Sequence, residues 1–200
     1  MSSVRVFWWV DPSLVDTGVW DYETLLSWKG GELVATARTR RTLRIETGGE
    51  TFYLKIQYHP RWRPRYFARH AAYYREARAY ERMRGLGLRV PQVVALGERR
   101  RLGFLIDALI VTRQVRDAVD LLRWSHAGFR PQPHLPPFEI VRDELERTVE
   151  RIHRLGYRFG DLKWRNILAA PADSSGSHVV FLDQRRFGRR LRRREEVRPE

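Results

Sequence analysis

Two short motifs near the end of this chain constrain its fold and chemistry more than any other feature. The segment F-G-D-L-K-W-R-N-I-L contains Asp161 and Asn166, and the apolar segment V-V-F-L-D ends at Asp183. Asp161 offers a carboxylate that can accept a proton, while Asn166 and Asp183 offer the hard oxygen atoms that Mg²⁺ prefers. Ile167–Ala170 and Val179–Leu182 flank a polar turn and predict a β-hairpin, which would bring Asp183 back toward Asn166.

An aspartate five residues before an asparagine, followed by an aspartate that closes an apolar strand, is typical of a kinase catalytic loop and its metal-binding strand. In that arrangement Asp161 would accept the proton of an attacking hydroxyl, and Asn166 and Asp183 would hold Mg²⁺. On this segment alone a simpler interpretation stays open, namely a polar loop between a helix and a hairpin.

An upstream strand favours the kinase interpretation. Thr51–Gln57 alternates, so that Phe52, Leu54 and Ile56 share one face and Lys55 projects from the other. Kinases place the lysine that holds the nucleotide phosphates on such a strand. Of the 38 basic residues in the chain only three are lysines, and a compact ammonium is not interchangeable with a guanidinium. The alternative is an ordinary solvated lysine on a half-exposed strand.

In a kinase this lysine pairs with a glutamate on the following helix. Tyr66–Arg84 lacks Pro and Gly and ends before Gly85, which predicts a helix. Glu76 lies on one stripe with aromatic residues, where a carboxylate needs a cation to offset its desolvation. Glu81 sits among arginines and is more simply a surface residue. We therefore predict that Glu76 is the partner of Lys55.

The pattern along the chain predicts an α+β architecture of two lobes. The first would be a five-stranded antiparallel sheet with one helix, preceded by an aromatic-rich segment with a short helix at about Asp21–Lys29. We expect its strands at 33–38, 43–46, 51–57, 91–98 and 108–115.

A connection at Val115–Ala118 would link the lobes, and its backbone together with Gln114 would contact adenine. Phe138–Leu155 has apolar residues at helical spacing and ends at Gly156, which predicts the main helix of a reduced, mainly helical second lobe. We place the boundary so that 1–117 hold the first lobe and its N-terminal segment, and 118–200 the second lobe and a basic tail.

Composition limits the other possibilities. The 200 residues contain no cysteine, which excludes disulfides and thiolate metal sites and fits a reducing compartment. We expect neither a signal peptide at the N-terminus nor a membrane span, since the longest apolar stretch, Phe104–Val111, is short and contains Asp107. The net charge of +14 favours anionic partners. Seven arginines at 185–194 are either a solvated tail or a contact to a membrane face or substrate phosphates.

The chain resembles the lipopolysaccharide core kinases of Gram-negative bacteria, the Kdo/heptose kinase family with a protein-kinase-like fold. The motifs that carry the resemblance span about residues 38–185 and are R-R-T-L-R-I-E, F-Y-L-K-I, R-E-A-R-A-Y-E-R-M-R-G-L-G-L-R-V-P, A-L-G-E-R and G-D-L-K-W-R-N-I-L. The resemblance implies an ATP-dependent kinase that phosphorylates a sugar of the inner core at the cytoplasmic face of the inner membrane. It assigns Lys55, Glu76, Asp161, Asn166 and Asp183 the roles described above.

The chain departs from kinases in three places. No glycine-rich loop precedes Lys55, and the turn over the phosphates would be A-R-T-R-R-T, with Arg40 and Thr42 as contacts to the nucleotide. Gln184-Arg185 follows the metal-binding aspartate in place of Phe-Gly. Only 17 residues follow Asp183, which leaves no room for the helices that dock peptide substrates and favours a small or lipid-linked acceptor.

These observations predict a phosphotransferase that uses ATP and Mg²⁺ and acts on a Kdo or heptose hydroxyl of lipopolysaccharide, at an anionic membrane surface. No specific nucleic acid is expected as a partner, although aromatic and basic residues alternate at Trp62–Tyr66. The alternatives are a minimal protein-kinase-like or small-molecule kinase and, from another class, a pseudokinase-like basic scaffold that binds membrane or nucleic acid. A scaffold has no need of Lys55, Asp161, Asn166 and Asp183 together.

Overall fold

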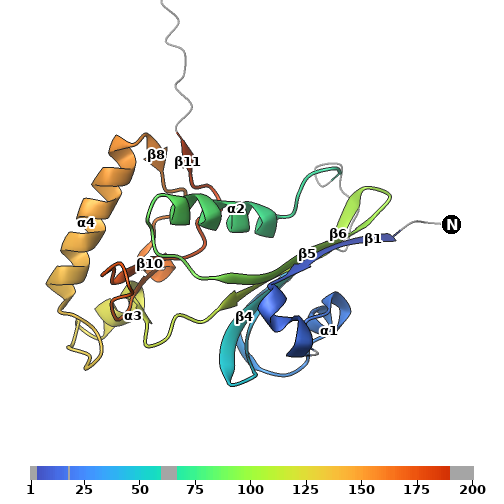
Figure 1. Ribbon diagram of the computed structural model, residues 1–200, viewed down its shortest axis with the longest axis horizontal. Coiled ribbons are helices and arrows are strands. Elements are labelled where there is room, and N and C mark those ends of the chain that lie inside the picture. The colour runs from blue at the N-terminus through green and yellow to red at the C-terminus, as the bar shows by residue number, and fades with distance from the viewer. Residues whose placement is uncertain (1–3, 18, 60–66, 190–200) are drawn as a thin grey trace, which may run out of the picture.

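The computed structural model describes residues 4–17, 19–59 and 67–189. They form a first lobe around a large antiparallel sheet and a smaller second lobe that carries the long helix α4 on its outer side (Figure 1). The elements of the first lobe are β1 (Val4–Val10), η1 (Pro12–Thr17), α1 (Tyr22–Leu26), β2 (Glu32–Ala37), β3 (Arg40–Thr47), β4 (Glu50–Tyr58), α2 (Ala72–Gly85), β5 (Val93–Arg101) and β6 (Phe104–Arg113).

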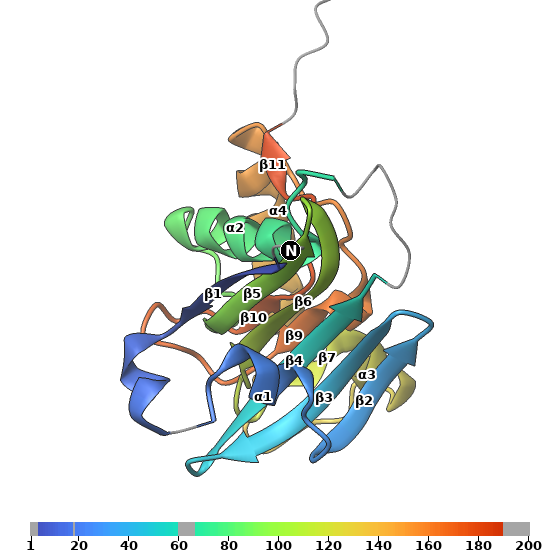
Figure 2. The ribbon, with the colours of Figure 1, turned by 90° about the vertical axis from the view of Figure 1, so that its right-hand side faces the viewer.

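The main sheet has six strands in the order β1-β5-β6-β4-β3-β2, all paired antiparallel, and Figure 2 shows them side by side. The prediction of five strands was therefore wrong. The additional strand is β1, which pairs with β5 from Val4↔Arg101 to Val10↔Ala95. Its V-R-V-F-W-W-V sequence is rich in β-branched and aromatic residues, which is a strand signal.

The two faces of strand β4 have different neighbours. Phe52, Leu54 and Ile56 are fully buried against α1 and the aromatic N-terminal segment. Helix α2 packs on the opposite face of the sheet (Figure 2). Lys55 points to that face, because its ammonium contacts Glu76 of α2. The predicted alternation is therefore confirmed, and it delivers an ammonium to the face that α2 covers.

Helix α2 begins later than predicted, at Ala72 instead of Tyr66. Residues 60–66 lie outside the described part of the chain, as does the predicted interleaving at 62–66. Ala68 has a φ of 52°, a left-handed conformation that cannot continue a helix, so the helical run starts only after it. The end of α2 at Gly85 agrees with the prediction.

In the second lobe the long helix α4 (Phe138–Arg154) matches the prediction to within one residue. The short helix α3 (Leu121–His126) was not predicted, although Asp120 caps it by accepting a hydrogen bond from Arg123 N. The other elements are β7 (Val119–Asp120), β8 (Tyr157–Arg158), η3 (Trp164–Asn166), β9 (Ile167–Ala169), β10 (Val179–Phe181) and β11 (Gly188–Arg189).

The predicted hairpin is present as β9 and β10, which pair from Val179↔Ala169 to Phe181↔Ile167 and extend with β7 into a small sheet. Strands β9 and β10 share one apolar cluster with α3, α4 and the end of α2. Helix α2 therefore packs against both lobes. Within the described ranges no helix is long and apolar enough to cross a membrane.

Candidate active site

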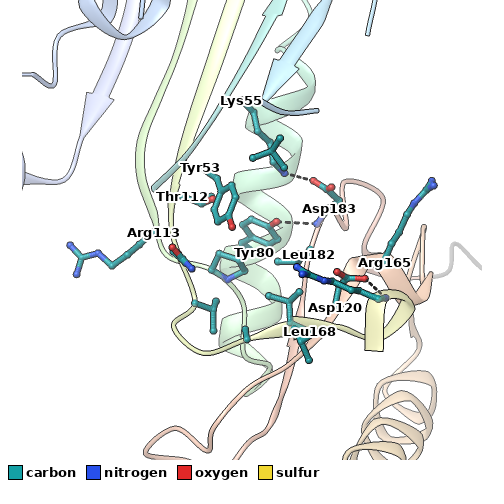
Figure 3. Close-up of a pocket in the computed structure, with 17 residues that line it drawn as sticks. Tyr53, Lys55, Tyr80, Thr112, Arg113, Asp120, Arg165, Leu168, Leu182 and Asp183 are labelled. Atoms are coloured by element: carbon teal, nitrogen blue, oxygen red, sulfur yellow. Dashed lines mark hydrogen bonds and ion pairs between the residues drawn. The ribbon is translucent and has the colours of Figure 1, made fainter. Parts of the chain in front are cut away.

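A cavity of about 320 Å³ lies where the two lobes meet (Figure 3). Lys55 of β4 and Tyr80 of α2 line it from the first lobe, while Leu168 of β9 and Asp183 after β10 line it from the second. The connection between β6 and β7 closes one end. Residues distant in sequence therefore meet around one space, as the predicted site requires.

Lys55 connects the two lobes electrostatically. Its Nζ donates to Glu76 Oε1 at 2.8 Å and also forms an ion pair with Asp183 (Figure 3 shows the second contact). Burial alone would lower the pKa of Lys55, but the carboxylates of Glu76 and Asp183 outweigh it and raise that pKa. Lys55 is therefore a permanent positive charge at the lobe junction.

Glu76 is the partner, as predicted. Its side chain is 0% exposed, whereas Glu81 on the same helix is exposed. The second carboxylate oxygen of Glu76 accepts a hydrogen bond from Arg185 Nε at 3.0 Å, and the Arg185 guanidinium lies over the ring of Tyr73. Two cations thus compensate one buried carboxylate, which is what burial of a charge demands.

One interpretation of the arginines at 185–194 was a solvated tail, and Arg185 does not fit it. Arg185 is part of the site, because its side chain reaches Glu76 on α2. Residues 190–194 lie outside the described residues.

Asp183 follows β10 with a φ of 53°, and its N–H donates to the Tyr80 hydroxyl at 3.0 Å. Burial would raise the pKa of Asp183, but Lys55 and Arg185 outweigh it and hold that pKa below its usual range. Asp183 is therefore an anion at neutral pH.

The loop before β9 brings Asp161 and Asn166 together. Asn166 Nδ2 donates to the Asp161 carbonyl at 3.0 Å and to Asp161 Oδ2 at 3.2 Å, and the Asn166 carbonyl accepts from Leu182 N at 2.8 Å. The Asp161 side chain stays 41% exposed, so an acceptor can reach it. The Lys163 ammonium, 2.7 Å away, lowers the pKa of Asp161 and keeps it ionised.

Gln184 holds the loop that contains Asp161 in place. It is fully buried; its Nε2 donates to the carbonyls of Asp161 (2.9 Å) and Leu182 (3.1 Å), and its Oε1 accepts from Asp161 N at 3.3 Å. The Gln-Arg pair that replaces Phe-Gly therefore has two tasks, since Gln184 holds Asp161 and Arg185 holds Glu76. Sequence reasoning assigned neither, and the only signal was a long polar residue directly after an apolar strand.

Gly160 is required by a close approach of two chain segments. A Cβ at this position would lie 2.2 Å from the Cβ of Arg186, so any side chain would push the Asp161 loop away from the segment after Asp183. The glycine before Asp161 thus follows from packing.

The predicted nucleotide contacts lie in two places. Gln114 and Val115 line the main cavity, and Gln114 N–H is already used by the Thr51 carbonyl at 2.9 Å. Thr42 sits opposite Lys55 on the neighbouring strand β3, whereas Arg40 at the start of β3 lines a second hollow.

Magnesium would be held by few protein ligands here. Among the described residues no three His, Cys, Asp or Glu side chains cluster as a metal site. Mg²⁺ commonly uses one or two carboxylates with substrate phosphates and water, and the oxygen donors of Asp183 and Asn166 fit that pattern.

A strand lysine that pairs with a glutamate on the following helix is a feature of protein kinases. The model of the lipopolysaccharide kinase (Kdo/WaaP) family matches residues 27–198, and the chain belongs to that family. The protein is therefore a kinase.

A solved structure, described as WaaP in complex with acyl carrier protein, has a similar fold. Its TM-score is 0.61 at 24% sequence identity, over 92% of this chain and 73% of that one. No curated protein matches the chain.

Proposed function

We propose that this lipopolysaccharide kinase transfers the γ-phosphate of ATP to a Kdo or heptose hydroxyl of the inner core. The observation that carries the proposal is the link from Glu76 through Lys55 to Asp183, which joins α2, β4 and the end of β10 at one cavity. Membership of the family supports the substrate class.

In this mechanism the nucleotide lies in the main cavity, with its adenine at the connection that contains Gln114 and Val115. Lys55 neutralises phosphate charge, and Thr42, opposite Lys55 on β3, contacts the phosphates from the sheet side. Glu76 holds the Lys55 ammonium at 2.8 Å in the position that this contact needs. Positioning and charge neutralisation supply most of the rate enhancement in such reactions.

The acceptor hydroxyl approaches Asp161, whose exposed carboxylate accepts its proton as the oxygen attacks the γ-phosphorus. The bond between that phosphorus and the β–γ bridging oxygen breaks, and ADP leaves with the electron pair. Asp183 and Asn166 would hold Mg²⁺, which when bound supplies positive charge to the phosphate oxygens.

The net charge of +14 supports work at an anionic surface. We infer that the protein acts in the cytoplasm at the inner face of the inner membrane, bound peripherally, because its acceptor is a membrane glycolipid.

The substitution Asp183→Asn tests the nucleotide part of the proposal. It removes an anionic ligand from a site with few protein ligands, and a contact to a charged group contributes about 1.5–3 kcal/mol. We therefore expect calorimetry to show Mg·ATP binding weakened by roughly tenfold or more, with little change for ATP without metal. Equal Mg·ATP affinity in both proteins would contradict the assignment and favour the basic scaffold.

A further inference from the structure

A second hollow of about 320 Å³ lies at the N-terminus of α2. Arg40, Arg69, His70 and Arg75 line it, with Gln57 and the first residues of the helix. None of its lining residues is acidic. Within the described ranges the three guanidinium groups form no ion pair with a carboxylate. The three guanidinium groups thus gather positive charge that no carboxylate of the described residues pairs with, while His70 Nδ1 lies 3.7 Å from Glu98 Oε1.

The start of α2 adds backbone donors to this charge. Its N-cap residue, Ala71, has no side chain that caps the helix, and Glu98 Oε2 takes only the Ala71 N–H, at 2.9 Å. The N–H groups of Ala72 and Tyr73 have no partner inside the helix and favour an anion, whereas the Tyr74 N–H donates to the Ala71 carbonyl at 3.2 Å. Arg100 Nε binds Glu98 at 2.7 Å and compensates the charge of that buried carboxylate.

Gln57 points to a ligand independently of the helix. Gln57 lines the hollow and is 5% exposed, and its Oε1 is buried without a hydrogen-bond partner among the described residues. A buried acceptor left unpaired is costly, and a turn of the Gln57 amide toward the hollow would let a ligand hydroxyl satisfy it. The chemistry of the hollow therefore matches a ligand with an anionic group beside hydroxyl groups.

The hollow lies next to the main cavity. Gln57 follows Lys55 by two residues on β4, so both side chains are on the same face of the sheet, roughly 7 Å apart along the strand. A sugar-containing ligand can span this distance.

The geometry points to an anion subsite in this hollow, which binds a phosphate or carboxylate group carried by the hydroxylated acceptor. This inference rests on the proposed function for the identity of the acceptor, but the subsite itself does not require phosphotransfer.

Calorimetric titration of the full chain with a hexose 6-phosphate, inorganic phosphate and the neutral hexose tests the subsite without any catalysis. We expect the hexose phosphate to bind most tightly. Arg75→Gln should weaken that binding roughly tenfold, the value of one charge-assisted hydrogen bond. Gln57→Leu, which removes the unpaired acceptor with little change of volume, should weaken it several-fold.

Arg78→Gln is the matched control, because Arg78 is also exposed on α2 but does not line the hollow. The affinity of the Arg78→Gln variant for the hexose phosphate should stay within about twofold of that of the unaltered protein. Equal losses in Arg75→Gln and Arg78→Gln would mean diffuse attraction to a basic surface and would overturn the inference. Unchanged affinity in Gln57→Leu would overturn it as well.

Phosphotransfer kinetics distinguish the source of the anionic group. If the glycolipid acceptor carries it, Arg75→Gln should raise the KM for the glycolipid several-fold and leave the KM for ATP unchanged. If both KM values stay unchanged while hexose phosphate binding is lost, the acceptor assignment is wrong and the hollow binds a free sugar phosphate.

Discussion

Replacing Asp161 by asparagine should lower phosphotransfer by roughly 10²- to 10⁴-fold, the usual contribution of a general acid–base group. The fold and nucleotide affinity should persist, since Asp161 is 41% exposed and the Gln184 bonds to this loop go to its backbone. The measurements are kcat, calorimetric affinity for Mg·ATP, and thermal unfolding.

Asp143→Asn is the control for this change. The side chain of Asp143 on α4 is 48% exposed and forms only a surface pair with Arg142 among the described residues, so transfer should be unaffected. If Asp161→Asn transferred phosphate at nearly the rate of the unaltered protein, Asp161 would have no part in the mechanism.

Replacing Glu76 by alanine should lower the free energy of unfolding by about 3–5 kcal/mol, because removal of one partner leaves buried charge uncompensated. Glu76 is fully buried and pairs with Lys55 and Arg185, and Asp183 remains as a partner only for Lys55. Activity should fall too, since Lys55 loses the contact that orients it. Denaturant unfolding and kcat measure the two effects.

Glu81→Ala makes the same chemical change on an exposed position of the same helix and should alter stability by less than about 0.5 kcal/mol. Similar unfolding curves for the two variants would show that the Glu76 pair does not stabilise the lobe junction.

The parts of the site that could be predicted from sequence are those that follow from local periodicity. Alternation on β4 places Lys55 opposite Phe52 and Leu54, and helical spacing places Glu76 on the buried stripe of α2. Asp161 and Asn166 lie in one short loop, so the spacing of their motif could also be recognised from the sequence. The resemblance to a kinase family predicted that these residues belong to one site.

The missed parts depend on contacts between distant segments. The strand β1 is an edge strand with several exposed apolar residues, and its role becomes visible only through its pairing with β5. Arg185 stands in a run of arginines, and only the approach of α2 distinguishes it from its neighbours. Gln184 is polar yet fully buried, because its partners are backbone groups of a loop 23 residues earlier.

The most direct test of the proposed function is phosphotransfer itself. The protein would be incubated with Mg²⁺, ATP labelled at the γ-phosphate, and lipopolysaccharide that lacks core phosphate. We predict label in the inner-core sugar of the glycolipid, dependent on Mg²⁺ and lost in Asp161→Asn. A protein that binds Mg·ATP but leaves this glycolipid unlabelled, while it labels another acceptor or none, would contradict the proposal.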